Sequence, residues 1–466
     1  MVPALLWCEA CSLDAAVWRP ILAILAAAAA SPLLVRAAPG YDPWTWLLWG
    51  REVASGTLST ADGPAFKPLP VAVCALLAPL GSAAPVLWVV LVRAAAGVAL
   101  WLAYRLGREL GERWPRGPGS LAGIRPEGET RRTPAVAGVL AAAGVALAGG
   151  FALEASRGSE APLVIAGALA AVACWRAGRL RAALGLGAAC ALLRVEAWPF
   201  LLAAGVVAWR RDAGVRPLLA VLALLVPAAW FVPEWLGSGD ALRSGARARV
   251  PNPGQPALAD VPALASLWAA ATLLLIPLWV GVVLALRDRR LRILAAAGGA
   301  WVLLVAAMAE AGFSGEPRYA LPGVALLAIA GAAGLARASL PAPLIAGLVA
   351  VAAMPAVVEL HDVRDAQAHQ WALARDLGDA VAAAGGREAV LACGRPYVGR
   401  YRGPLMAYAL DVAKRAVEPD LAPRAPGIVF RARLTAASAP APQAGPPFRE
   451  AARVGEWEVL RSCASN

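Results

Sequence analysis

Residues 41–70 read YDPWTWLLWGREVASGTLSTADGPAFKPLP, and this stretch guides the interpretation of the rest of the chain. Its first acid, Asp42, follows a membrane-length apolar segment and lies between the aromatic residues Tyr41 and Trp44. Near its other end stands Lys67, and the sequence contains only one further lysine, Lys414. A carboxylate and an isolated ammonium at the two ends of one polar stretch suit a site where an acid removes a proton and a cation holds an anionic group.

The composition indicates a membrane protein. The chain has 466 residues, of which 60% are hydrophobic and only 16% charged, and its mean hydropathy is +0.62. Apolar runs of about 20 residues recur along it, the length that a helix needs to cross a bilayer. Backbone groups in the hydrocarbon core must be satisfied within the protein, so these runs are expected to be helices. We therefore predict an all-α polytopic protein of the cell membrane, with the lipid bilayer as its first partner.

The distribution of arginine predicts the topology. Arginine-rich loops alternate with arginine-poor loops, and the positive-inside rule assigns the rich ones to the cytoplasm. This places the N-terminus in the cytoplasm and residues 39–67 outside it. It also accounts for the net charge of +12 without nucleic acid as a partner. About eleven spans are expected; they are residues 18–38, 85–106, 134–153, a span ending near 174, two short helices at 182–193 and 199–209, and 217–235, 261–286, a span ending near 309, 318–337 and 340–358.

The composition changes after residue 358, which divides the chain into a transmembrane domain (1–358) and a smaller extracytoplasmic α/β domain (359–466). A helix is predicted over 362–384, strands over 389–393, 427–431 and 457–463, and a Pro/Ala-rich linker over 440–447. Cys393 and Cys463 each end a predicted strand on the oxidising side of the membrane, so a disulfide between them is expected.

Metal-binding patterns are sparse. Cys8 and Cys11 form a CxxC pair with no second pair, so no zinc site is predicted. His361 and His369 both follow the last span and cannot serve inside the membrane part. No metal ligands are assigned, although a divalent cation stays open as a cofactor.

Several charged residues stand where an apolar segment or the charge rule would not place them. Arg194 and Glu196 interrupt a hydrophobic run, where charges are costly and tend to be functional or mutually paired. Arg318 and Tyr319 stand at the outer end of a span, and arginine is suited to bidentate phosphate binding. Glu160 lies in an outer turn. The topology brings all of them to the same face as Asp42 and Lys67.

Each of these residues also has a purely structural interpretation. Asp42 before Pro43 could cap a helix. Trp44 and the neighbouring tryptophans could anchor the chain at the bilayer interface, and Lys67 could extend toward the headgroups. Arg194 and Glu196 could simply pair with each other, and Glu160 could be a solvated turn residue.

The order of these features resembles the GT-C superfamily of polytopic glycosyltransferases, in particular its protein O-mannosyltransferase-like and lipid A aminoarabinose transferase-like branch. The resemblance covers about residues 18–340. The residues that carry it are Asp42 in the first outer loop, Lys67-Pro68-Leu69-Pro70 at the end of that loop, Gly81 and Arg93 around the second span, Leu193-Arg194-Val195-Glu196, and Arg318-Tyr319-Ala320-Leu321-Pro322. The chain departs from the family in having Asp42-Pro43 where Asp-Glu is common, and Arg-Val-Glu where the family has a lysine turn.

The resemblance implies transfer of a sugar, with mannose as one candidate, from a polyprenyl-phosphate donor to an extracytoplasmic acceptor, with inversion. Asp42 would be the general base, and Lys67, Arg194 and Arg318 would hold the donor phosphate. The residues left to contact sugar or acceptor are Tyr41, Trp44, Glu160, Glu196 and Tyr319. Neither the acceptor nor the sugar is specified by the sequence.

Two alternative functions are compatible with the same features. A transporter or flippase of lipid-linked sugars would show internal repeats and broken helices in both halves. A non-catalytic scaffold for envelope assembly would keep the fold without turnover.

Overall fold

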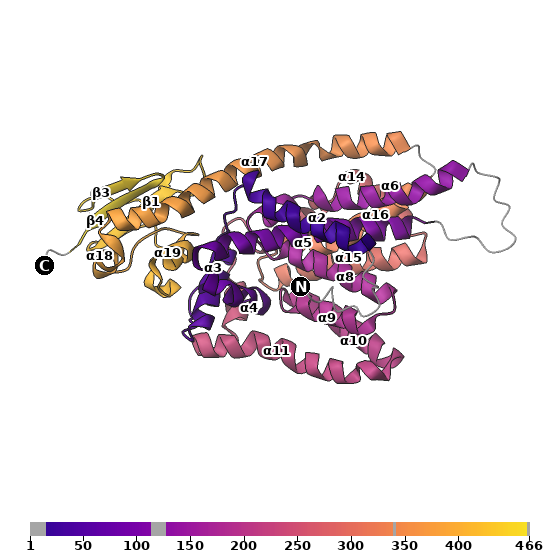
Figure 1. The fold of residues 1–466 in the computed structure, drawn as a ribbon, viewed down its shortest axis with the longest axis horizontal. Helices are drawn as coiled ribbons and strands as arrows, with labels where there is room; N and C mark the ends of the chain where they lie inside the picture. The colour runs from indigo at the N-terminus through magenta and orange to yellow at the C-terminus, as the bar shows by residue number, and fades with distance from the viewer. Residues whose placement is uncertain (1–14, 113–126, 339–341, 464–466) are drawn as a thin grey trace.

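The computed structural model describes residues 15–112, 127–338 and 342–463. Helices make up most of it, and a small sheet lies at one end (Figure 1). Cys8 and Cys11 and the arginine-rich loop around residue 116 lie outside the described residues. The helices up to residue 211 are α2 (Ala15–Ala30), η1 (Ser31–Leu33), α3 (Tyr41–Ala54), α4 (Pro68–Leu77), η2 (Ala78–Ala83), α5 (Ala84–Gly111), α6 (Glu127–Ala146), α7 (Phe151–Ser156), α8 (Ala161–Arg176), α9 (Leu180–Ala191), η3 (Val195–Ala197) and α10 (Trp198–Arg211).

The second half continues in the same manner. Its helices are η4 (Ala213–Val215), α11 (Arg216–Ser238), α12 (Arg243–Ala248), η5 (Pro256–Leu258), α13 (Pro262–Leu273), α14 (Ile276–Ala285), α15 (Arg289–Glu310), η6 (Pro317–Tyr319), α16 (Leu321–Arg337), α17 (Ala342–Ala383), α18 (Gly386–Ala392), α19 (Gly403–Leu410) and η7 (Lys414–Ala416). Proline stands in the first two positions of α4, α8, α10 and α16. Its fixed φ and missing N–H are tolerated there, so proline marks where these helices begin.

Helix α16 is the centre of the bundle. All its residues from Leu321 to Leu335 are buried, as expected for a helix that is apolar on every side. Glycine lets α14 approach it closely, because a Cβ atom on Gly281 would lie 2.1 Å from the carbonyl oxygen of Gly331. Small residues at such a contact are the usual means of packing membrane helices.

The expected number of about eleven spans is only partly supported. Among the described residues, three helical segments are long and apolar enough to cross a membrane, namely 68–111, 213–238 and 289–310. The pair α13–α14 would add a fourth, although its two helices are bent by 100°. Among the described residues this is the one bent pair that is apolar and long enough to form a broken span, whereas a transporter would be expected to show one in each half. The other apolar helices are shorter, so the full count stays a prediction.

The C-terminal part contains a four-stranded antiparallel sheet in the order β2-β1-β4-β3. Its strands are β1 (Gly427–Arg433), β2 (Pro440–Ala441), β3 (Arg449–Val454) and β4 (Trp457–Ser462). The predicted strands at 427–431 and 457–463 are therefore confirmed, as is a helix over 362–384. Cys393 and Cys463 form a disulfide between the end of α18 and the end of β4.

One predicted strand is wrong. Residues 389–393 belong mainly to helix α18, whose sequence GREAVLA is rich in good helix formers. A buried strand would place several β-branched residues in the core, but Val390 is the one buried β-branched residue of this segment, so packing does not favour a strand.

The division at residue 358 falls inside α17, which runs without a break from Ala342 to Ala383. Figure 1 shows this long helix leading from the bundle to the sheet. The two-domain division stays a prediction.

The sequence predicted a polar loop over residues 39–67, and this prediction is wrong for part of the segment. They contain α3, whose Trp46 and Trp49 are fully buried. The apolar run of tryptophan and leucine folds into a helix because α4 and the C-terminal part cover it. Trp44 packs against Tyr408 of α19 with ring centroids 5.3 Å apart, and Arg51 forms an ion pair with Asp411 at 3.1 Å.

Candidate active site

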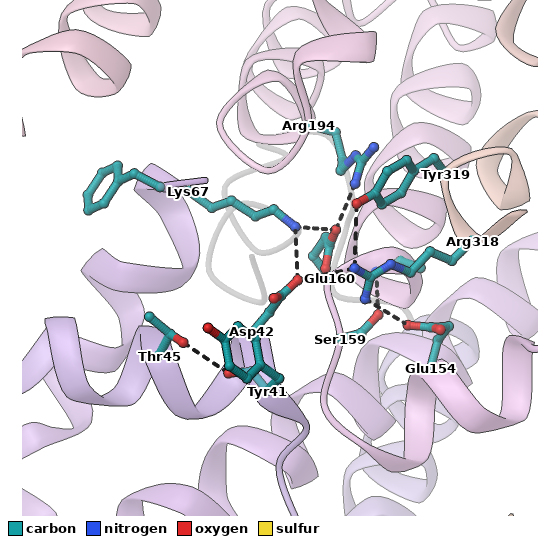
Figure 2. A network of polar contacts seen from close by, with 12 residues as sticks. Tyr41, Asp42, Thr45, Lys67, Glu154, Ser159, Glu160, Arg194, Arg318 and Tyr319 are labelled. Carbon is teal, nitrogen blue, oxygen red and sulfur yellow. Dashed lines mark hydrogen bonds and ion pairs between the residues drawn. The ribbon is translucent and has the colours of Figure 1, made fainter. Parts of the chain in front are cut away.

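Asp42 lies in the first turn of α3 and does not cap it. The N-cap position is held by Gly40, and no side chain caps the helix. The carboxylate points instead toward two cations, with Oδ2 3.2 Å from Arg318 Nη2 and 4.0 Å from Lys67 Nζ (Figure 2). Three chain segments separated by up to 276 positions thus meet at one oxygen.

Lys67 is the N-cap residue of α4, and its ammonium is turned into the protein. The side chain is 10% exposed and pairs with Glu160 at 2.5 Å. It also lies 5.1 Å from the ring centroid of Trp46. The proline residues that follow begin α4 and fix the direction of the chain at Lys67.

Glu160 occupies the turn before α8 and is 1% exposed. Its Oε1 accepts hydrogen bonds from Lys67 and, at 3.0 Å, from Arg194, whereas Oε2 is buried without a partner among the described residues. Burial opposes the charged form, but Lys67, Arg318 and Arg194 outweigh it and hold the pKa of Glu160 below its ordinary value. Glu160 therefore keeps its charge and holds two cations together.

Arg194 and Glu196 form a bidentate ion pair in the turn between α9 and α10. Arg194 Nε donates to Glu196 Oε2 at 3.0 Å. The guanidinium carbon lies 3.4 Å from the ring centroid of Tyr319, which fixes the plane of the fork. The structural interpretation, mutual pairing, is correct, yet both residues also face the cavity described below.

Arg318 joins the same group from η6, just before α16. It contacts Asp42 and lies 3.9 Å from Glu154 Oε2. Its Nε is buried and has no hydrogen-bond partner in the described part of the chain. A buried N–H without a partner is costly, so this atom is suited to a ligand.

A cavity of about 790 Å³ opens beside these residues. It is lined by Asp42, Lys67, Arg194, Glu196 and Arg318, with the rings of Tyr41 and Tyr319. The charged side chains of this group are at most 19% exposed, and we call this part of the lining the inner end. Its walls are mostly apolar, and they include Trp198, Trp230, Phe231, Leu304, Met308 and Phe313. The volume lies in the range of small-molecule sites.

Two of the expected contact residues do not line this cavity. Trp44 points to the C-terminal part, where it packs on Tyr408. Glu160 lies behind Lys67 and Arg194. Of the other residues quoted for the family resemblance, Arg93 donates to the carbonyl oxygens of Val35, Arg36 and Ser156, which makes it a link between segments.

Sequence reasoning missed the outer end of the cavity. Arg247 of α12 and, from the C-terminal part, Arg400 and Tyr401 also line the cavity. Arg247 is half-buried and the other two are exposed, and we call this part of the lining the outer end. Arg247 could have been found, because it belongs to a loop that the predicted topology places outside the cytoplasm, where the charge rule does not expect arginine, as for Arg318. Nothing in the sequence marks Arg400 or Tyr401, since a surface loop of a small domain commonly contains such residues.

No dedicated metal centre is evident in residues 15–112, 127–338 and 342–463. No three His, Cys, Asp or Glu side chains there are grouped as metal ligands would be.

Comparisons with known proteins identify the fold. No family model matches the chain, and no curated protein matches it. Among solved structures, the chain is similar to the crystal structure of ArnT from Cupriavidus metallidurans bound to undecaprenyl phosphate. The TM-score is 0.51 at 14% identity, and the match covers 96% of this chain and 98% of that one.

At this identity the similarity shows the fold. The chain has the fold of ArnT, which is the GT-C-like fold that the sequence resemblance implied. That fold and the apolar helices are those of a membrane protein. The side of the membrane on which the termini lie stays a prediction.

Proposed function

We propose that this chain is a membrane glycosyltransferase that takes a sugar from a polyprenyl-phosphate donor and passes it to an acceptor outside the cytoplasm. The observation that carries the proposal is the meeting of Asp42, Lys67 and Arg318 at the inner end of one cavity. The fold agrees with it, since the similar structure, ArnT, holds undecaprenyl phosphate.

The donor phosphate would bind to Lys67, Arg194 and Arg318. Without a donor, these three cations face the four carboxylates of Asp42, Glu154, Glu160 and Glu196. A phosphate entering from the cavity would take over part of their pairing, and the unpartnered Nε of Arg318 offers it a further donor. Glu160 lies behind the cations and would keep them in position.

Asp42 would be the general base. The acceptor oxygen attacks the anomeric carbon, and its proton passes to Asp42. The bond from that carbon to the phosphate oxygen breaks, and the polyprenyl phosphate leaves with the electron pair. Attack from the side opposite the phosphate inverts the anomeric centre. Once the cations turn toward the phosphate, the Asp42 oxygen that they occupy becomes free to accept the proton.

The apolar wall would accept the prenyl chain. Trp230, Phe231, Leu304 and Met308 offer an aromatic and aliphatic surface next to the cationic end. A lipid with an anionic head matches this arrangement of one polar end and one apolar wall.

The test is transfer from a radiolabelled polyprenyl-phosphosugar, with mannose as the first sugar, in membranes that contain the wild type or Asp42→Asn. We expect the variant to lose transfer by about 10²- to 10⁴-fold, the usual contribution of a general base. Asp260→Asn is the matched control, because Asp260 is exposed and does not line the cavity. Wild-type transfer by Asp42→Asn would remove Asp42 as the base. Movement of the intact labelled lipid across the bilayer without bond cleavage would favour a flippase.

A further inference from the structure

Two arginines at the outer end of the cavity have no acidic partner in the described part of the chain. Arg247 comes from α12, and Arg400 from the loop between α18 and α19. Neither forms an ion pair within the described residues, and Arg247 donates only to the carbonyl oxygen of Val250, at 2.9 Å. This differs from the inner end, where each cation contacts at least one carboxylate.

The acids on this side of the cavity are already engaged. Asp62 pairs with Lys414 at 2.7 Å, and the Lys414 side chain is only 5% exposed. Glu316 accepts a hydrogen bond from Gln255 Nε2 at 2.6 Å. Both acids and both of their partners line the cavity. Arg247 and Arg400 therefore keep uncompensated positive charge at its outer end.

The loop that carries Arg400 is held firmly. Arg402 is 3% exposed and donates to the carbonyl oxygens of Val398 and Ala441, at 3.2 and 2.7 Å. Between Arg400 and Arg402, Tyr401 adopts a left-handed backbone conformation with a φ of 68°. That conformation is unfavourable for a residue other than glycine, and such strain is concentrated at ligand-binding positions.

Tyr401 connects this loop to the proposed base. The residue is 43% exposed, and its ring meets the ring of Tyr41 edge-on, with centroids 6.1 Å apart. Tyr41 immediately precedes Asp42. A molecule that reaches from the outer arginines to Asp42 would therefore pass along these two rings.

We propose that Arg247 and Arg400 form an anion-binding subsite, and that the acceptor carries a phosphate or carboxylate group that binds there while its hydroxyl reaches Asp42. This inference rests on the proposed function for the identity of its ligand as the acceptor. Guanidinium groups bind such anions through paired N–H donors, and the rigid loop lowers the ordering cost of binding. Tyr41 and Tyr401 would contact the part of the acceptor between its anion and its hydroxyl.

The subsite is tested by binding, without turnover. The purified full chain in detergent is titrated with inorganic phosphate, glycerol phosphate and citrate, and affinity is measured by calorimetry. The variants are the double variant Arg247→Gln with Arg400→Gln, Lys67→Met, and Arg449→Gln. Arg449 is the matched control, since it is an exposed arginine of β3 outside the cavity.

We expect the wild type and Arg449→Gln to bind an anion saturably. The double variant should bind it at least about tenfold more weakly, because it loses the charge-assisted hydrogen bonds of two guanidinium groups. The absence of anion binding by the wild type would overturn the proposal. Unchanged affinity in the double variant would also overturn the proposal. This includes the case in which Lys67→Met alone loses anion binding.

The source of the anion is distinguished in nanodiscs. If phosphatidylglycerol raises the melting temperature of the wild type more than phosphatidylcholine does, and the double variant lacks this difference, the anion is a lipid headgroup. Protection by glycerol phosphate alone would identify a soluble or sugar-borne anion. Undecaprenyl phosphate binding should be the same in the double variant and the wild type. Failure of the wild type to bind undecaprenyl phosphate would count against the proposed function and leave the anion titration to decide the subsite.

Discussion

The arginines at the two ends of the cavity differ in whether they form ion pairs. At the inner end, Arg194 is buried and Arg318 is half-buried, and both contact carboxylates. At the outer end, Arg247 is half-buried and Arg400 exposed, and neither has an ion pair in the part that the structure describes. The inner charges need one another to be stable inside the protein, whereas the outer charges are stable in water and free to bind a ligand. A charge network therefore indicates where stability and chemistry are linked, and unpaired charges indicate where a ligand can be recognised.

The largest expected effect is on stability at the inner end. Arg194→Met should destabilise the protein by about 3 to 5 kcal/mol, because it leaves Glu196 buried without its bidentate partner. Arg194→Met combined with Glu196→Leu should recover most of that loss. Melting of the purified variants, followed by tryptophan fluorescence, measures both. Equal melting temperatures for Arg194→Met and the wild type would mean that this pair does not stabilise the inner end.

A slightly smaller effect is expected on turnover. Lys67→Met should lower kcat/KM for the polyprenyl-phosphosugar by about 10²- to 10³-fold, since it removes one donor from the group that stabilises the leaving phosphate. The assay compares amounts of folded protein matched by their melting curves. Unchanged kcat/KM would show that Lys67 does not stabilise the leaving phosphate and serves only as the ion-pair partner of Glu160.

Glu52 of α3 gives a pH-dependent effect on the helix that carries Asp42. Burial raises the pKa of Glu52 to about 7 from 4.5, although Ser59 N–H donates to its carboxylate. Between these two pH values the folded state binds more protons than the unfolded state, so the free energy of unfolding decreases as pH rises. Glu52→Gln should remove this decrease. Melting temperatures of both proteins between pH 4.5 and 7.5 measure it, and parallel curves would contradict it.

The smallest expected effect is on stability at the outer end. Arg247→Gln should change the free energy of unfolding by less than about 0.5 kcal/mol, as is usual for a substitution of a residue with no buried partner. The same melting assay used for Arg194 measures it. A large loss would mean that Arg247 is structural, and the contrast between the two ends would disappear.

The sequence was most informative about the inner end. Arg194 and Glu196 attract attention because they interrupt an apolar run, and Lys67 because lysine is so rare in this chain. Such residues stand out only where the surrounding composition makes a charge costly. The GT-C-like fold was anticipated from the order of the same residues, and the similarity to ArnT agrees with it.

Local pattern could not provide the rest. Glu160 was expected to contact a ligand, yet it lies behind two cations, a distinction that depends on side-chain packing. Residues 389–393 resembled a strand because five residues are too few to separate the two periodicities. Arg400 and Tyr401 come into contact with the bundle only through the docking of the C-terminal part on α3, and no spacing along the chain encodes that contact.

The decisive measurement is a single experiment on Asp42→Asn that follows donor binding and sugar transfer in the same membranes. If the cations at the inner end hold the phosphate and Asp42 takes the proton, the variant binds the labelled polyprenyl-phosphosugar as the wild type does and transfers at least about 10²-fold more slowly. Transfer at the wild-type rate with full donor binding would contradict this function for Asp42.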